Sequence, residues 1–299
     1  MLMWILQSAI MLLAILLAVA FITLLERAYM GVVQCRRGPN KVLLWGIIQP
    51  VLDGMKLMVK TLNKPFYLNY LLFTFIPSIN LLVFLLFWIG MPYLFSLFDF
   101  YLNSLFVMIL LGMLGFGLLL SSWASNSKYA LYGSLRSMVQ SISYEICLSL
   151  IILMMLNLKD SFSFYVTWKG FLSLELLFSW MFYLPIIMMI LAECGRTPFD
   201  FMEAESELVS GFNVEYGSVE FAFLFMAEYG MIITLSILFC VLLSSVMSNY
   251  LPIIIISSVL FTRYTFPRLR YDYLMSFMWK VLLPVTIMIW VMIFNVKIL

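Results

Sequence analysis

Histidine is absent from this chain of 299 residues, and only 11% of the residues are charged. Without imidazole there is no histidine-ligated haem, zinc, copper or iron, and no Ser–His or Cys–His nucleophile pair. The four cysteines lie tens of residues apart and form no Cys-x-x-Cys motif, so neither an iron–sulfur cluster nor a disulfide framework is indicated. The sequence therefore predicts a chain with no metal site and no redox centre of its own.

Apolar side chains are abundant: they make up 65% of the residues and give a mean hydropathy of +1.08. An ordinary soluble domain is about half apolar and about a quarter charged, so most of this chain belongs in hydrocarbon. Runs of roughly 20 apolar residues predict about eight transmembrane helices. Their approximate cores are residues 2–25, 68–90, 100–122, 139–157, 172–194, 217–246, 250–266 and 279–297. We predict an all-α polytopic membrane protein whose residues 1–299 form a single membrane domain.

Lysine and arginine are distributed unevenly between the two sides of these predicted helices. Basic residues accumulate in loops on the side from which helices are inserted. Fourteen of the 17 Lys and Arg residues lie in, or border, the loops that follow the first, third, fifth and seventh helices. We therefore expect these odd-numbered loops to face the cytoplasm or the mitochondrial matrix, with both termini on the opposite side. The first apolar run lacks a basic leading segment and a small-residue cleavage site, so we expect it to be retained.

Acidic residues are scarce, and their placement is informative. Eight of the 15 lie between residues 193 and 228, although a carboxylate at bilayer depth costs about 2.5–3.5 kcal/mol. A solvated acidic loop over residues 195–216 is the simple interpretation. However, Glu193 ends one apolar run and Glu228 lies inside another, which a solvated loop does not explain. This placement favours a cluster with a role in proton chemistry.

Within this loop, Asp200, Glu203 and Glu207 are spaced so that they would share one face of a helix. Neighbouring carboxylates of this kind titrate as a group, so they can hold or pass protons without histidine.

Glu145 is a further acid inside an apolar run, about two helical turns into the fourth predicted span. Intramembrane acids are expensive and commonly functional, so Glu145 is a candidate station in a line of carboxylates across the protein interior. The alternative is a single buried acid that is protonated and hydrogen-bonded to a neighbouring helix. The sequence leaves both interpretations open.

The first long loop, residues 26–65, carries seven basic and two acidic residues. After Pro50, which suits a first helical turn, the polar residues Gln49, Asp53, Lys56 and Lys60 recur at helical spacing. This pattern predicts an amphipathic helix that lies in the membrane interface. It could merely anchor the loop to anionic lipid, but an acid such as Asp53 does not help lipid attraction and suggests ligand steering or pairing with a nearby arginine.

The basic stretch at residues 34–40 is too short for nucleic-acid binding and has no interleaved aromatic residues. It fits an acidic partner surface or a polar opening at the membrane face.

These segments make the sequence recognisable. The chain closely resembles the mitochondrially encoded chain 1 family of NADH-ubiquinone oxidoreductase, the membrane subunits at the heel of respiratory complex I. The most specific match is R-T-P-F-D at residues 196–200, followed by E-S-E-L-V-S-G-F-N-x-E-Y at residues 205–216. Cys194–Gly195 departs from the family, since many relatives carry a polar pair there. The other matching segments are residues 25–27, 34–40, 49–56, 123–127, 141–145, 192–193, 226–229 and 268–272.

The resemblance implies eight transmembrane helices whose loops at residues 26–65 and 195–216 face the matrix and complete a ubiquinone chamber with partner subunits. It implies a location in the mitochondrial inner membrane, with both termini on the intermembrane-space side. Ubiquinone would be the substrate of a shared site, and this chain would bind no redox cofactor or NADH itself. The implied partners are the peripheral-arm iron–sulfur and quinone-site subunits, the other membrane subunits and the lipid bilayer.

The resemblance also implies two sets of site residues. Those that match the family's quinone channel are Arg27, Arg36, Asp53, Arg196, Asp200 and Glu203. Those that match its proton-coupling path are Glu145, Glu193, Glu203, Glu205, Glu207 and Glu228. A stand-alone proton or ion transporter that uses the same carboxylates is the alternative function, and a passive membrane anchor for soluble subunits is a third.

Overall fold

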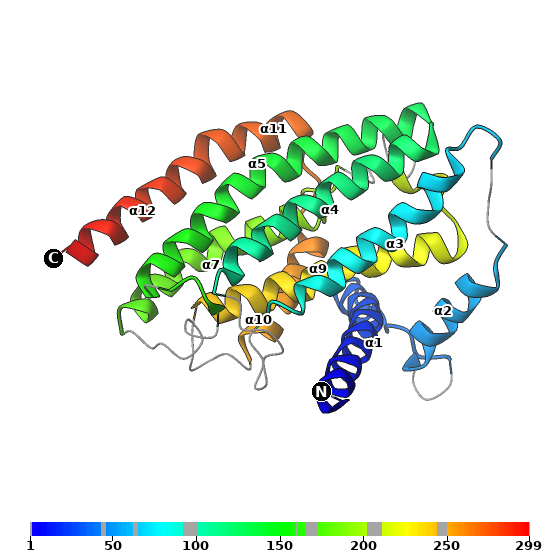
Figure 1. Ribbon diagram of the computed structural model, residues 1–299, viewed down its shortest axis with the longest axis horizontal. Helices are drawn as coiled ribbons and strands as arrows, with labels where there is room; N and C mark the ends of the chain where they lie inside the picture. Colours follow the sequence, from blue (N-terminus) through cyan, green and yellow to red (C-terminus); the bar gives the residue numbers. More distant parts are fainter. Residues whose placement is uncertain are drawn as a thin grey trace.

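The computed structural model of the protein is a bundle of helices whose long axes run mostly alongside one another (Figure 1). It describes residues 2–42, 46–61, 65–91, 101–159, 161–164, 173–201, 211–243 and 250–298. Within these ranges the regular structure is helical and no strand occurs. The prediction of an all-α polytopic membrane protein is confirmed.

Six helical segments in the described ranges are long and apolar enough to cross a membrane. They are α1 (Leu2–Val33), α3 (Tyr70–Phe87), α4 (Asn103–Ser125), α5 (Lys128–Lys159), α9 (Ser218–Leu243), and a composite of α11 (Tyr271–Phe277), a π-helical turn (Met278–Leu282) and α12 (Leu283–Ile298). Two shorter apolar segments are Met181–Glu193, within α7 (Ser173–Glu193), and α10 (Leu251–Thr265). Together these match the eight predicted runs.

Several helices extend beyond the apolar runs that predicted them. The first helix continues past Glu26 and Arg27 to Val33, and α5 begins at Lys128 although its apolar run begins near residue 139. Charged side chains interrupt hydropathy without interrupting backbone hydrogen bonding, because Lys and Arg are good helix formers. Hydropathy therefore marks the apolar part of each helix, while the helix itself extends further.

Burial differs strongly among the spans. In α9, 83% of the most apolar window is buried, against 17% in α1 and 22% in the composite C-terminal span. The α9 helix packs against α1, α3, α7 and α10, whereas α12 packs mainly on α5. The exposed faces of α1 and α12 are rich in Leu, Ile and Met, as expected for surfaces that contact lipid.

The predicted amphipathic helix is present as α2 (Gln49–Val59), with Pro50 in its first turn and no buried residue. It lies at one edge of the bundle and contacts α1 and α9 (Figure 1). Its apolar side chains, including Met58 and Val59, are exposed. This exposed apolar face is the expected arrangement for a helix in the membrane interface.

Candidate functional site

The C-terminal end of α7 sets the position of Arg196. Arg196 N donates to Leu191 O at 3.0 Å and Gly195 N donates to Ala192 O at 3.2 Å, which is the Schellman pattern of helix termination. Gly195 occupies the left-handed region with φ of 56°. Glycine adopts this conformation without steric cost, so the departure from the family pattern at this position suits the backbone. The turn sends Arg196 back into the bundle, where it is 3% exposed.

The segment that carries Arg196 is held by two neighbouring helices, α5 and α10. Gln140 of α5 donates from Nε2 to Ala192 O at 2.7 Å and to Phe199 O at 3.0 Å. Thr197 Oγ1 donates to the carbonyl of Arg263 at 2.9 Å. The Thr197–Pro198 peptide bond is cis. These contacts fix the backbone on both sides of Arg196.

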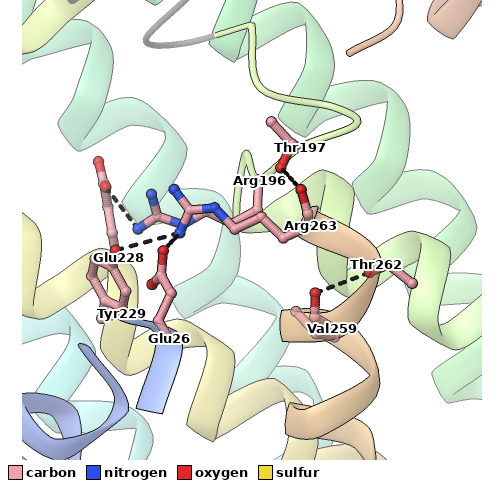
Figure 2. A network of polar contacts seen from close by, with 8 residues as sticks. All are labelled: Glu26, Arg196, Thr197, Glu228, Tyr229, Val259, Thr262 and Arg263. Carbon is pink, nitrogen blue, oxygen red and sulfur yellow. Dashed lines mark hydrogen bonds and ion pairs between the residues drawn. The ribbon is translucent and has the colours of Figure 1, made fainter. Parts of the chain in front are cut away.

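The Arg196 side chain lies between a carboxylate and an aromatic ring (Figure 2). Its Nη2 is 3.5 Å from Glu228 Oε2, and its Cζ lies 4.3 Å from the centroid of the Tyr229 ring. Arginine stacks well on aromatic faces and pairs with carboxylates, so one side chain satisfies both neighbours. Glu228 and Tyr229 both come from α9, the most buried helix.

A second buried ion pair lies beside the first, between Arg263 of α10 and Glu26 of α1 (Figure 2). Arg263 Nη1 also donates to Tyr229 Oη at 3.5 Å. Tyr229 thus contacts both arginines. The two ion pairs connect α1, α9, α10 and the end of α7 through charged groups in the protein interior.

Glu193 and Glu228 line a common internal cavity of about 50 Å³. Glu193 Oε2 is buried and has no hydrogen-bond partner among the described residues. The cavity thus brings together two carboxyl groups from different helices, Glu193 of α7 and Glu228 of α9. Besides Glu193, Cys194 and Glu228, the lining residues are Asn80, Leu114, Gly115, Leu118, Ser137, Ser141, Leu224, Ala227 and Met231.

Glu145 lies one helical turn beyond Ser141, which lines this cavity. Both side chains pack against glycines of α4. A methyl group added at Gly112 would lie 3.0 Å from Glu145 Oε1, and one added at Gly115 would lie 2.9 Å from Ser141 Oγ. The carboxylate of Glu145 therefore continues the polar line that begins at Glu228.

A separate basic pocket of about 650 Å³ opens near the end of α1. Arg27 Nη1 lies 2.9 Å from Asp53 Oδ2, so the predicted pairing of Asp53 with a nearby arginine is present and joins α1 to α2. Arg36 donates from Nε to Gln34 Oε1 at 2.8 Å and lines the same pocket. The other residues that line it are Met30, Arg37, Gly38, Pro39, Asn40, Lys41, Val42 and Gln49.

Comparisons with known proteins assign this chain to a family. The family model described as NADH dehydrogenase matches residues 6–294. The chain belongs to the NADH dehydrogenase family. It is 40% identical over 289 residues to NADH-ubiquinone oxidoreductase chain 1 of Aedes aegypti, covering 94% of this chain and 91% of that one. It is 41% identical over 282 residues to the same-named chain of Artemia franciscana, covering 92% of each. The chain 1 protein of Didelphis virginiana is 41% identical over 290 residues, covering 91% of this chain and 90% of that one.

Membership in the NADH dehydrogenase family confirms the resemblance identified from the sequence. The structure brings the predicted residues together in two places. Arg196, Glu193 and Glu228 meet in the interior, with Glu145 nearby. Arg27 and Arg36 line the basic pocket, and Asp53 pairs with Arg27 beside it. Asp200 is partly buried and lines neither cavity. The predicted residues Glu203, Glu205 and Glu207 lie outside the described residues.

The sequence arguments assigned no site role to Glu26, Arg263 or Tyr229. Each charged member of this group lies near the end of an apolar run, where hydropathy alone predicts the start of a loop. The available signal was an acid and a base that each border an apolar run at the same predicted face of the membrane. Such a pair lowers its burial cost by pairing, which is common for charges within membranes.

Proposed function

We propose that the chain is a membrane subunit of proton-translocating NADH:ubiquinone oxidoreductase in the mitochondrial inner membrane. The observation that carries this proposal is the joined set of Arg196, Glu228, Glu193 and Glu145, which links a buried arginine to carboxylates on three helices. Family membership supports the assignment to the oxidoreductase. NADH oxidation and the iron–sulfur clusters belong to partner subunits, and this chain supplies no redox group.

Ubiquinone enters from the bilayer beside α1 and α2 and is reduced close to the matrix surface. Three observations support this route: the exposed apolar face of α2, the adjacent basic pocket and the Arg27–Asp53 pair at the junction of the two helices. The quinone ring carries two carbonyl oxygens that gain negative charge on reduction, and arginine side chains stabilise such charge. The basic loops face the matrix, in accordance with the distribution of Lys and Arg.

Reduction of ubiquinone consumes protons, and the carboxyl groups respond by changing their protonation. Charge that appears near Arg196 weakens its pairing with Glu228, because both anions compete for one guanidinium group. Glu228 then takes up a proton, and the change passes through the cavity to Glu193 and on toward Glu145. Glu203, Glu205 and Glu207 of the acidic loop connect the quinone chamber with this path in the proposal.

Replacement of Glu193→Gln in the assembled complex tests the proposal. We expect normal assembly and normal NADH oxidation with a hydrophilic electron acceptor, because neither depends on the cavity. We expect the rate of proton translocation coupled to ubiquinone reduction to fall by about 100-fold, the scale of a lost proton-transfer group. The matched control is Glu215→Gln, since Glu215 is outside the cavity and accepts a hydrogen bond from Tyr67 Oη at 3.3 Å. Unchanged pumping in Glu193→Gln would refute the proposed path.

The alternative, a stand-alone transporter, predicts a different result for the isolated chain. A transporter keeps its proton or ion flux when purified and reconstituted alone. On the present proposal the isolated chain is inert, because the driving reaction takes place on partner subunits. Sustained ion transport by the reconstituted chain would favour the alternative.

A further inference from the structure

Asn80 is a buried polar residue in the middle of α3 that the proposed proton path does not use. It is 2% exposed, and its Oδ1 atom has no hydrogen-bond partner among the described residues. A buried amide oxygen without a hydrogen bond costs a few kcal/mol, so the burial of this atom within an apolar span requires an explanation. The surroundings of its side chain supply one.

The helix that faces Asn80, α4, has a glycine at the point where the Asn80 side chain approaches. A methyl group at Gly117 of α4 would lie 1.7 Å from Asn80 Oδ1, which no real structure tolerates. Gly117 lies five residues after Gly112 and two residues after Gly115, the glycines against which Glu145 and Ser141 of α5 pack. The glycines of α4 therefore give room to polar side chains from both neighbouring helices. The carboxamide of Asn80 therefore packs against the same helix as Glu145 and Ser141.

Asn80 also lines the cavity that contains Glu193 and Glu228. The cavity volume of about 50 Å³ is enough for about three water molecules, since each water molecule needs roughly 10–15 Å³. Most of the lining is apolar, but two carboxyl groups and an amide border the cavity, and a buried water molecule needs two to four polar partners of this kind.

The hydrogen-bonding groups of this cavity are unequal. Ser137 Oγ donates to Ser134 O at 2.7 Å, and Ser141 Oγ donates to Met138 O at 3.0 Å, so both hydroxyl protons are already engaged. Asn80 Oδ1 and Glu193 Oε2 are both buried hydrogen-bond acceptors without a partner among the described residues. A water molecule donates two hydrogen bonds and also accepts them. It can therefore donate to the Asn80 amide oxygen and to one carboxylate, while its own oxygen accepts from a protonated carboxyl group.

We propose that Asn80 is a positioning residue whose Oδ1 accepts a hydrogen bond from a water molecule between Glu193 and Glu228. The other hydrogen of this water then points at one carboxylate, and its oxygen accepts from the protonated carboxyl group of the other glutamate. The protonated carboxyl group of one glutamate gives its proton to this water, which passes one of its own protons to the other carboxylate. The water is regenerated, and one proton has moved between the two side chains. This inference rests on the proposed function, in which Glu193 and Glu228 exchange protons.

The test replaces Asn80→Leu in the complete assembled complex, because leucine has a similar volume but no hydrogen-bonding group. We expect proton-coupled ubiquinone reduction to slow by about threefold to tenfold, the factor that corresponds to one ordinary hydrogen bond. We also expect a larger solvent deuterium isotope effect on this rate, because proton transfer becomes limiting. If Asn80→Leu does not assemble, Asn80→Ala serves, since it removes the carboxamide without a clash at Gly117.

The matched control is Asn103→Leu in α4. Asn103 is also buried, at 6% exposed, but its Nδ2 donates to Gly90 O at 2.5 Å and it does not line the cavity. A merely structural role for Asn80 predicts that both variants lower the amount of assembled complex and that neither changes the isotope effect. A normal rate and isotope effect in assembled Asn80→Leu and Asn80→Ala complexes would overturn the inference. If Glu193→Gln still abolishes pumping in that case, the proposed function stands; if Glu193→Gln pumps normally, the proposed function fails as well.

Discussion

Two ion pairs of the same chemical kind occur in very different surroundings. Arg196 and Glu228 face each other in the interior with side chains 4% and 13% exposed, whereas Arg27 and Asp53 pair at the edge with both side chains 47% exposed. A buried charge that loses its partner remains uncompensated, while an exposed charge is taken over by water and salt. The interior pair therefore contributes to stability in addition to its place in the proposed proton path. The peripheral pair is free to exchange its partner for a ligand.

The largest effect is expected from Arg196→Met, which leaves Glu228 without its cation. Removing one partner of a buried pair costs about 3–5 kcal/mol. The stacking on Tyr229 is lost as well. We expect a marked fall in the thermal midpoint of the complex and in the amount assembled. Arg196→Lys should restore part of the loss, because it keeps the charge without the planar stacking surface.

A somewhat smaller effect is expected from Glu26→Gln, which weakens the second interior pair. Arg263 is 20% exposed at its side chain, so water compensates it in part. Its place in the last turn of α10 also lets the helix dipole stabilise the cation. We expect a loss of about 2–4 kcal/mol, measured as a lower thermal midpoint. A thermal midpoint as low as that of Arg196→Met would contradict this expectation, because it would mean that both ion pairs contribute equally to stability.

The contrast between the two regions also explains what the sequence could predict. The spans and the amphipathic helix follow from hydropathy and local spacing, because each depends on residues of one segment. For Asp53 the sequence left ligand steering and pairing with a nearby arginine both open, and the structure pairs it with Arg27. The placement of Glu228 and Glu193 inside apolar runs marked them as unusual. Their meeting in one cavity depends on how α7, α9 and α4 pack, which no periodicity in the sequence specifies.

Asn80 and the Glu26–Arg263 pair show the same limit more sharply. The sequence around Asn80 does not distinguish it from an ordinary polar residue. Its unusual surroundings depend on Gly117, which lies 37 residues later in the chain, on α4. Glu26 and Arg263 are 237 residues apart in sequence. Single-sequence reasoning detects costly residues, but it does not identify their partners on distant helices.

An intermediate effect is expected from Gly117→Ala, which tests how tightly the interior polar region is packed. The added methyl group collides with Asn80 Oδ1, and overpacking of this kind costs about 1–3 kcal/mol. Gly54→Ala in α2 is the matched control, because no heavy atom lies within 4 Å of its added methyl group. The double variant Asn80→Ala with Gly117→Ala should regain much of the lost thermal stability. An equal loss of thermal stability in the single and double variants would show that the strain does not come from the contact with Asn80.

The smallest effect on stability is expected from Asp53→Asn at the peripheral pair. Exposed pairs contribute about 0–1 kcal/mol, and salt screens them further, so the thermal midpoint should hardly move. Arg27 would then be free of its carboxylate. If the pocket guides ubiquinone, the KM for ubiquinone changes while NADH oxidation with a hydrophilic acceptor does not. A large drop in thermal midpoint would break the comparison, because it would mean that assembly with partner subunits buries this pair as deeply as Arg196 and Glu228.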